Sequence, residues 1–303
     1  MHVYTHAACL AHDTGPDHAE RPARLRTVLH ALEAAHPDLD WQQAPAATRG
    51  QLLRVHDPRL LEAVLETQPA ALHPLDPDTV LSPHSAEAAL RAAGAGVAAV
   101  DAVLSGRTRR AFCAVRPPGH HATVSAAMGF CLFNNIAVAA RQAIDGHGLE
   151  RVAIVDFDVH HGNGTQAIFE RDARVCFAST HQWPLYPESG ARNETGCGNI
   201  FNVPLPKGTD GPVFRTAWRD ELLPAVEAFR PQLLLVSAGF DGHRLDPLAG
   251  WLLEAADYAW LTGELVALAE RHAGGRIVSL LEGGYDLTAL AECCVAHVDV
   301  LRM

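Results

Sequence analysis

The chain has 303 residues, of which 48% are hydrophobic and 19% are charged, and its formal net charge is −11. This acidic balance argues against nucleic-acid binding, which usually involves a basic patch, and suits small cationic or basic-peptide ligands. The seven cysteines form no CxxC pair, so we expect reduced thiols in a cytoplasmic protein. We expect no signal peptide and no membrane span, because the N-terminus lacks a basic and apolar leader and every apolar run is short.

Short apolar runs alternate with helical patterns along the chain. The expected strands cover residues 2–5, 111–115, 152–156, 175–179, 233–237 and 277–281. The expected helices cover residues 22–35, 59–66, 84–104, 134–145, 213–229 and 255–272. Strands that are apolar throughout fit a parallel sheet covered on both faces, so the alternation predicts an α/β fold. The Pro-rich stretches 67–83 and 182–198 are expected loops, and without a repeat or a long linker we expect one domain over residues 1–303.

The stretch "RVAIVDFDVHHGNG" is an apolar strand that ends in titratable residues. In open α/β sheets, ligands bind beyond the carboxyl ends of the strands. Asp156 and Asp158 lie on one face of such a strand, and His160 follows them if the extension continues. Carboxylates with an imidazole suit zinc or another first-row divalent ion. The alternative is a capped strand end, in which the carboxylates accept backbone N–H groups.

A catalytic zinc ion needs about three protein ligands and an open position. A third candidate follows another apolar strand, in "SAGFDGHRLDPLAG", where Asp241 and Asp246 both qualify. Taken alone, "LDP" is an ordinary turn with Asp before Pro.

Two further stretches carry groups suited to acid–base chemistry. In "RPPGHHA", a rigid turn precedes His120 and His121, which could act as a base and an acid if each ring is oriented by its own partner. In "LLEGGYDL", a strand ends in Glu282, and Tyr285 is presented on a loop where its phenol could donate to an oxyanion. The alternatives are two solvated histidines on a surface turn and a tyrosine that only packs.

The glycines of "GAG" at 94–96 invite comparison with a dinucleotide-binding loop. The stretch follows no strand and lacks the third glycine of that motif, so the match is weak. It lies in an Ala-rich helical pattern, and we expect close helix packing there.

Together and in this order, "RPPGHHA", "GFCLFNN", "DFDVHHGNGTQ", "SAGFDGHRLDPLAG" and "EGGYDL" resemble the zinc-dependent histone deacetylase family of the arginase–deacetylase superfamily. The "HHGNG" form is similar to the class II branch, which includes bacterial histone deacetylase-like amidohydrolases and acetylpolyamine amidohydrolases. The resemblance implies a three-layer α/β fold with a mainly parallel sheet of about eight strands. It also implies a zinc-dependent hydrolase that removes acyl groups from lysine side chains of proteins or peptides, or alternatively from acetylated polyamines.

The resemblance also implies a role for each matching position. The implied zinc ligands are Asp158, His160 and Asp246. The implied catalytic groups are His120, His121, Asp156 and Tyr285. The implied potassium site, partly through backbone oxygens, consists of Asp156, Asp158, His160, Ser179 and Thr180. The implied substrate channel is formed by Phe130, Tyr186, Leu253, Gly129, Gly283 and Arg24.

The chain departs from the family pattern at three positions. Asn163 stands where other branches carry an acid behind the second histidine, so His121 should be tuned differently. Ala19 replaces the proline of the common "HPERP". Leu253, with Glu254 beside it, stands where polyamine-preferring members carry an acidic gatekeeper, and this favours acyl-lysine over polyamine.

Two other functions fit the motifs less well. An arginase-type ureohydrolase needs a second metal ion held by "DxHxD", but the position two beyond His160 is Gly162. A degenerate fold that only binds a partner would have lost a ligand or the tyrosine, and all of these are present. The motifs leave open the acyl length, zinc or iron as the native metal, and whether the protein is a homo-oligomer.

Overall fold

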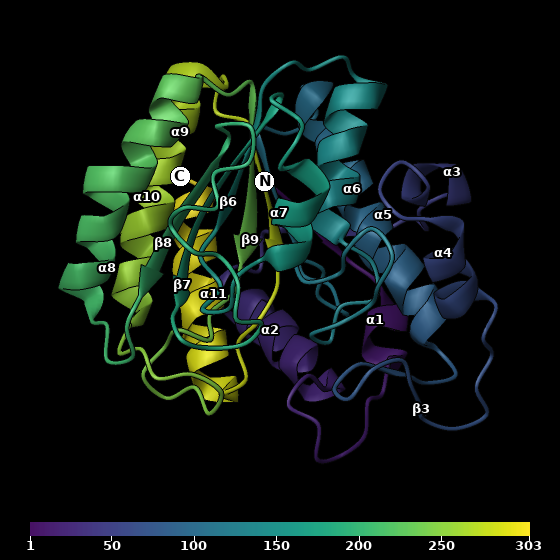
Figure 1. Ribbon diagram of the computed structural model, residues 1–303. Helices are drawn as coiled ribbons and strands as arrows, with labels where there is room; N and C mark the ends of the chain where they lie inside the picture. Colours follow the sequence, from purple (N-terminus) through teal and green to yellow (C-terminus); the bar gives the residue numbers. More distant parts are fainter.

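The computed structural model describes residues 1–303 and contains one eight-stranded parallel sheet between helical layers (Figure 1). Its strands are β1 (His2–Thr5), β2 (Asp40–Gln43), β5 (Arg110–Cys113), β6 (Val152–Asp156), β7 (Val175–Gln182), β8 (Ile200–Leu205), β9 (Leu233–Ala238) and β10 (Ile277–Leu281). Their order across the sheet is β2-β1-β5-β10-β9-β6-β7-β8, and every pairing is parallel. Two short strands, β3 (His73–Pro74) and β4 (Val80–Leu81), form a separate antiparallel pair. The expected α/β class and sheet size are confirmed.

Eleven α-helices accompany the sheet. They are α1 (Ala7–Ala11), α2 (Pro22–Ala35), α3 (Arg49–Leu52), α4 (Pro58–Leu65), α5 (Ser85–Leu104), α6 (Asn135–Arg141), α7 (Asn163–Phe169), α8 (Gly211–Ala217), α9 (Leu223–Phe229), α10 (Ala255–His272) and α11 (Leu287–Leu301). A π-helical turn at Gln142–Gly146 extends α6, and another at Trp218–Leu222 joins α8 to α9. Figure 1 shows α8 to α11 on one side of the sheet and α5 to α7 on the other. None of the helices has both the length and the apolarity needed to cross a bilayer.

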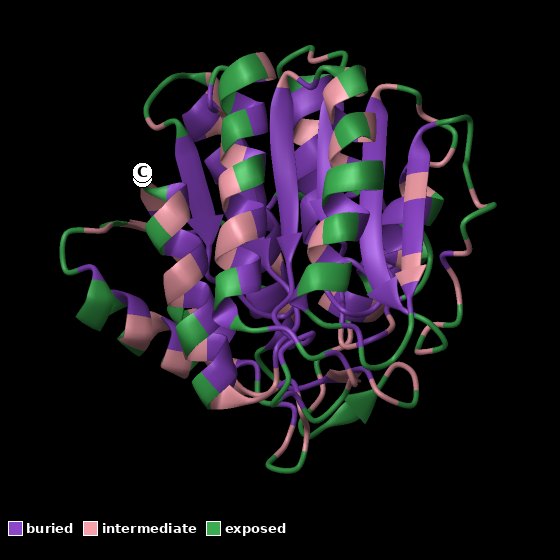
Figure 2. Ribbon diagram, turned by 90° about the vertical axis from the view of Figure 1, so that its left-hand side faces the viewer, coloured by how far each residue is buried: buried purple, intermediate pink, exposed green.

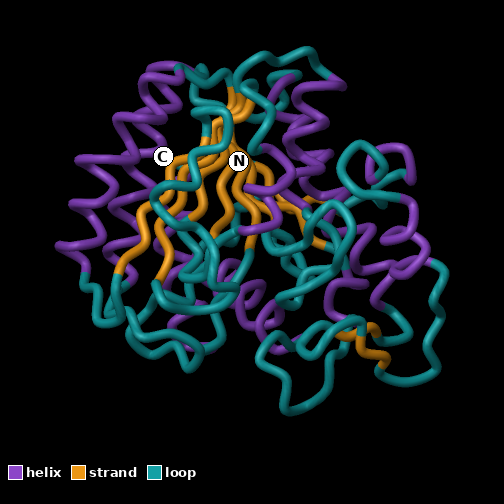
Figure 3. The backbone as a smooth tube through the Cα atoms, in the orientation of Figure 1, coloured by secondary structure: helices purple, strands orange, loops and turns teal.

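The central strands lie at the heart of the core. Every residue of β5, β6, β9 and β10 is buried, as the purple strands of Figure 2 show. Because helices cover both faces, these strands need no polar face, which explains their continuous apolar runs. A single cluster of 81 buried apolar residues joins the sheet to its helices. Loops gather at the carboxyl ends of the strands (Figure 3).

All six expected strands are present, but two strands at the edges of the sheet were not expected. Edge strand β2 has the sequence DWQQ and exposes Asp40 and Gln43, so it has no apolar run to reveal it. Edge strand β8 carries Asn202 and Pro204, both unusual in a buried strand. Helix α11 was also not expected, although Asp286 caps it by accepting the backbone N–H of Ala289, which is a common helix-start signal.

The glycines at 94–96 serve helix packing, as expected from the sequence. A Cβ atom on Gly94 would lie 1.9 Å from the backbone oxygen of Pro45 and 2.7 Å from the backbone nitrogen of Ala47. Helix α5 therefore touches the segment that follows β2 directly through its backbone, and no side chain fits between them.

Glycine-to-alanine substitutions at Gly94 and at Gly263, both within helices, should change the stability of the protein in opposite directions. Gly94→Ala should lower the free energy of unfolding by about 1–3 kcal/mol, because the added methyl overpacks a close contact. Gly263→Ala, in α10, meets nothing nearer than Val300 Cγ1 at 3.9 Å. It should raise stability by up to about 1 kcal/mol, because Ala is the better helix former. Urea unfolding of both variants measures the difference, and equal stabilities would contradict the packing argument.

Candidate active site

Four neighbouring strands deliver titratable residues to one place. In the sheet, β5, β10, β9 and β6 are adjacent, and their carboxyl ends meet at the same edge. The loop after β5 carries His120 and His121, and the loop after β9 carries Asp241. The end of β10 carries Glu282. The end of β6 begins the run from Asp156 to His160. Topology therefore gathers residues that lie far apart in the sequence.

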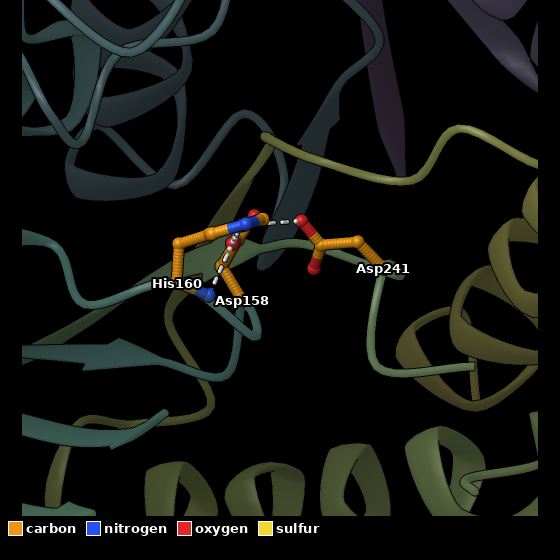
Figure 4. A group of neighbouring side chains, drawn as sticks. All are labelled: Asp158, His160 and Asp241. Carbon is orange, nitrogen blue, oxygen red and sulfur yellow. Dashed lines mark hydrogen bonds and ion pairs between the residues drawn. The ribbon is translucent and has the colours of Figure 1, made fainter. Parts of the chain in front are cut away.

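Asp158, His160 and Asp241 form the tightest group (Figure 4). Each offers a ligand atom, and these atoms all lie within 4.8 Å of one another. Nδ1 of His160 is 3.0 Å from Oδ2 of Asp241 and 3.2 Å from Oδ1 of Asp158. All three residues are buried, with at most 8% of their surface exposed. Two carboxylates and an imidazole at this spacing suit a zinc-like divalent ion.

The charges around Asp158, His160 and Asp241 also favour a bound metal ion. The buried carboxyl groups of the site form no ion pair with Lys or Arg; they belong to Asp156, Asp158, Asp241, Asp246 and Glu282. Although burial favours a neutral ring, Asp158 and Asp241 raise the pKa of His160 to about 10. The carboxylates thus draw a proton onto a residue that is ordinarily neutral. A divalent cation would supply that positive charge, so the residues present fit a bound metal ion.

Asp246, the third zinc ligand implied by the family resemblance, lies beside this group. Its Oδ1 accepts the backbone N–H of Leu248 at 2.9 Å, and its Oδ2 accepts that of Tyr285 at 2.7 Å. Burial, followed by the charge of Asp241, raises its pKa to about 7. The structure therefore brings Asp241 into the group of potential ligands and ties Asp246 to the loop of Tyr285.

The tandem histidines have unlike partners. Nδ1 of His120 lies 3.0 Å from Oδ2 of Asp156, and Nδ1 of His121 lies 2.8 Å from Oδ1 of Asn163. Against the effect of burial, Asp156 and Asp158 raise the pKa of His120 to about 10. Burial and the nearby His120 lower the pKa of His121 well below its usual value. Because the amide oxygen of Asn163 can only accept, His121 carries its proton on Nδ1 and leaves Nε2 free as a base.

Glu282, which was noted in the sequence but given no role, holds the histidine loop. Its Oε2 accepts the backbone N–H groups of Gly119 at 2.6 Å and His120 at 3.2 Å, and its Oε1 accepts the hydroxyl of Ser237 at 3.1 Å. Burial raises its pKa to about 7. The sequence signal for this role was a glutamate that ends a strand and is followed by two glycines.

Arg24 lies behind Tyr285. Its Nε donates to the backbone oxygen of Gly284 and its Nη2 to that of Glu282, each at 2.6 Å. Its guanidinium lies 4.8 Å from the centre of the Tyr285 ring. Burial raises the pKa of Tyr285 well above its usual value, so the phenol remains a hydrogen-bond donor.

A cavity of about 220 Å³ leads to these residues. It is lined by Asp78, His121, Gly129, Phe130, His160, Leu185, Tyr186, Leu248 and Tyr285. The structure thus brings the expected channel residues Gly129, Phe130 and Tyr186 together. It does not bring Leu253 there, because that side chain is fully buried in the core. Gly283 lies deeper, where its N–H donates to Oδ2 of Asp158 at 2.8 Å.

The turn that presents Phe130 is tightly constrained. Gly129 has φ of +56°, and a Cβ atom there would lie 2.5 Å from Cδ2 of His121. Phe130 itself has φ of +68°, which is uncommon for a residue with a side chain. Its N–H donates to Oγ1 of Thr79 at 3.0 Å, so the loop that carries Asp78 supports the channel wall. Asp78 was not expected from the sequence, although the paired acids of "DPD" were a visible signal.

Two further observations concern the expected potassium site and the second metal ion that a ureohydrolase would need. Asp156 pairs with Ser179 across β6 and β7, and the side chain of Thr180 accepts Nε1–H of Trp218 at 3.1 Å. The expected potassium site would use backbone oxygens of Ser179 and Thr180, which lie within β7 beside the end of β6. A Cβ atom on Gly162 would lie 2.2 Å from Oδ2 of Asp156, so the second-metal ligand of a ureohydrolase has no room.

Comparison with known proteins agrees with this geometry. Residues 18–301 match the family model described as the histone deacetylase domain. The chain is 42% identical over 291 residues to a histone deacetylase-like amidohydrolase of Pseudomonas aeruginosa, covering 94% of this chain and 77% of that protein. It is 39% identical to the human polyamine deacetylase HDAC10, covering 93% of this chain and 44% of that protein. The crystal structure of the HDA15 HD domain superposes with a TM-score of 0.93 at 37% identity, covering 99% of this chain and 87% of that one.

Asparagine substitutions test whether Asp241 or Asp246 is the third metal ligand. Asp241→Asn and Asp246→Asn should differ in zinc content after dialysis against equal zinc, measured as moles of metal per mole of folded protein. Loss of a supporting carboxylate should weaken binding by about 10–100-fold, and loss of a true ligand should weaken it further. Asp158→Asn is the positive control. Equal loss in both variants would show that the two carboxylates act together.

Proposed function

Because the chain belongs to the histone deacetylase family, we propose that it is a zinc-dependent deacylase of lysine side chains in proteins or peptides. The main support is the cavity of about 220 Å³ that leads between Phe130 and Tyr186 to His160 and Tyr285. Aromatic walls suit the aliphatic chain of an acylated lysine, and the polar end suits its amide. The family makes the chain an amidohydrolase; zinc and acyl-lysine are the finer parts of the proposal.

Asp158 and His160, with Asp241 or Asp246, would hold the zinc ion. When bound, zinc supplies a Lewis acid for the amide carbonyl and lowers the pKa of a water molecule. Backbone oxygens near Ser179 and Thr180 would hold potassium as a structural ion, which would offset part of the negative charge of Asp156.

Protein side chains carry out the proton transfers and stabilise the oxyanion in the proposed reaction. Nε2 of His121 is free to take the proton of the attacking water, while Asp156 keeps His120 protonated beside it. The hydroxyl of Tyr285 donates to the developing oxyanion. The proton held on a histidine then passes to the leaving amine. Arg24 keeps the loop of Tyr285 in place through the carbonyl groups of Gly284 and Glu282.

A second substrate class, acetylated polyamines, is favoured by one observation. Asp78 lines the cavity, is half-buried, and forms no ion pair with Lys or Arg. Burial and its neighbour Asp76 raise its pKa. Its carboxylate could meet a distal amine of a polyamine, and the human relative named a polyamine deacetylase is consistent with this alternative.

The unlike histidines predict a change in pH dependence. Asn163→Asp places a carboxylate at the atom that lies 2.8 Å from Nδ1 of His121. It should raise the pKa of His121 by about one unit or more, because an opposite charge favours the protonated ring. The ring of His121 must be neutral to act as the base. As the pH is lowered, activity should therefore begin to fall at a higher pH in this variant than in wild type. The acid limb of kcat/KM against pH measures the shift, and Asn163→Ala controls for loss of the amide alone.

The proposed function is tested by acetate release from an acetyl-lysine peptide and from acetylputrescine at equal concentration. Wild-type protein loaded with zinc should turn over the peptide faster, and a chelator should abolish turnover. Tyr285→Phe should lower kcat by about 10²–10³-fold with unchanged zinc content, because one oxyanion donor is lost. Undiminished turnover in this variant would overturn the role of Tyr285, and faster release from acetylputrescine would favour the polyamine alternative.

A further inference from the structure

Apolar side chains gather at one side of the channel entrance. Trp183, Leu185, Tyr186 and Leu248 are here called the apolar rim. Trp183, Tyr186 and Leu248 are among the few large hydrophobic residues with a third or more of their surface exposed, at 40%, 37% and 36%. Leu185, Tyr186 and Leu248 also line the cavity itself. The rim is therefore continuous with the channel that the acylated amine would enter.

The two loops of the rim are anchored to each other. The N–H of Gly250 donates to Oε1 of Gln182 at 2.8 Å, which joins the loop of Leu248 to the segment that leads into Trp183. The N–H of Trp183 donates to the backbone oxygen of Leu205 at 2.8 Å. Exposed apolar surface that is held in place beside a catalytic channel is typical of a binding surface.

We infer that the apolar rim binds a bulky apolar side chain two residues from the acylated lysine of a polypeptide, so that the enzyme selects peptides with such residues over free acetylated polyamines. This inference rests on the proposed deacylase function and adds a substrate preference to it. The cavity of about 220 Å³ holds little beyond a slender acylated chain. The remainder of the substrate must lie on the surface around the entrance.

The chemistry of the rim decides between the two substrate classes. Residues of an extended peptide are about 3.3 Å apart and their side chains alternate between two faces, so the residues two positions before and after the lysine, about 6.6 Å away, face the surface next to the channel. A leucine or phenylalanine there would be removed from water by the rim. A polyamine has no such group, and placing its charged amine on an uncharged rim would cost desolvation. Among the residues that line the cavity, Asp78, outside the rim, is the one that offers that amine a carboxylate.

The test uses three substrates with full-length, zinc-loaded protein. Two acetyl-lysine peptides differ only at the positions two residues before and two residues after the lysine, which are Leu in one and Asn in the other; the third substrate is acetylputrescine. Wild-type kcat/KM should be about tenfold higher for the Leu peptide than for the Asn peptide, equal to about 1.4 kcal/mol. The difference should lie mainly in KM, and acetylputrescine should be the slowest.

Substitutions in the rim should remove this preference. Leu248→Asn and Trp183→Ser should bring the two peptides within about twofold of each other, the loss being in the Leu peptide. Leu53→Asn is the matched control, because Leu53 is 43% exposed but lies outside the cavity, and it should keep the wild-type ratio. Circular dichroism and the bound zinc per mole of protein report whether each variant is folded.

The possible outcomes distinguish failure of the inference about the rim from failure of the proposed deacylase function. Equal kcat/KM for the two peptides, or fastest turnover of acetylputrescine, would overturn the inference while leaving the deacylase proposal intact. If no substrate is hydrolysed, the proposed function fails. The dissociation constants of fluorescently labelled Leu and Asn peptides then test the rim independently, and equal affinities would overturn it. A wild-type dimer that Leu248→Asn converts to a monomer would assign the rim to a second copy of the chain and also overturn it.

Discussion

Buried negative charge that the protein itself does not neutralise is the constraint on which the site depends. The carboxyl groups of Asp156, Asp158 and Asp241 lie in the interior with only histidines as charged partners. Burying an unpaired carboxylate costs several kcal/mol, so such a group is stable only with a proton or a cation. The raised pKa of His160, about 10, shows how strongly this interior attracts positive charge. A divalent ion would meet that demand at the place where the amide carbonyl of the proposed substrate would arrive.

The N-terminal segment shows the opposite solution to the same problem. Glu20 is fully buried, but Arg24 and Arg116 both pair with it, with Nη1 of Arg24 at 3.0 Å. Burial alone would raise the pKa of Glu20, yet the two guanidinium groups lower it to about 2. This carboxylate is neutralised by the chain, and it anchors Arg24 behind Tyr285. Compensated charge thus forms the scaffold, while uncompensated charge is confined to the strand ends where the metal ion is proposed.

The central part of the fold could be predicted from the sequence because it depends on short-range patterns, whereas the site residues lie far apart in the chain and were named mainly through their resemblance to the family motifs. Strands such as β6 and β9 are buried on both faces and therefore appear as continuous apolar runs. The position of Asp78 could not be predicted, because its loop reaches the channel through tertiary contacts, such as that of Thr79 with the backbone of Phe130, which no local pattern reveals. Leu253 was expected in the channel by counting along the chain, but its loop turns it into the core and presents Leu248 instead.

The difference between two adjacent histidines follows from the same distribution of charge. His120 faces the carboxylate of Asp156, whereas His121 faces the neutral amide of Asn163. One ring is therefore held protonated, and its positive charge helps to keep the other neutral. A second carboxylate at position 163 would raise the pKa of His121, so that this ring would remain a neutral base only at higher pH. An amide there orients His121 without charging it, so the sequence "HHGNG" would keep the proposed base neutral inside an acidic site.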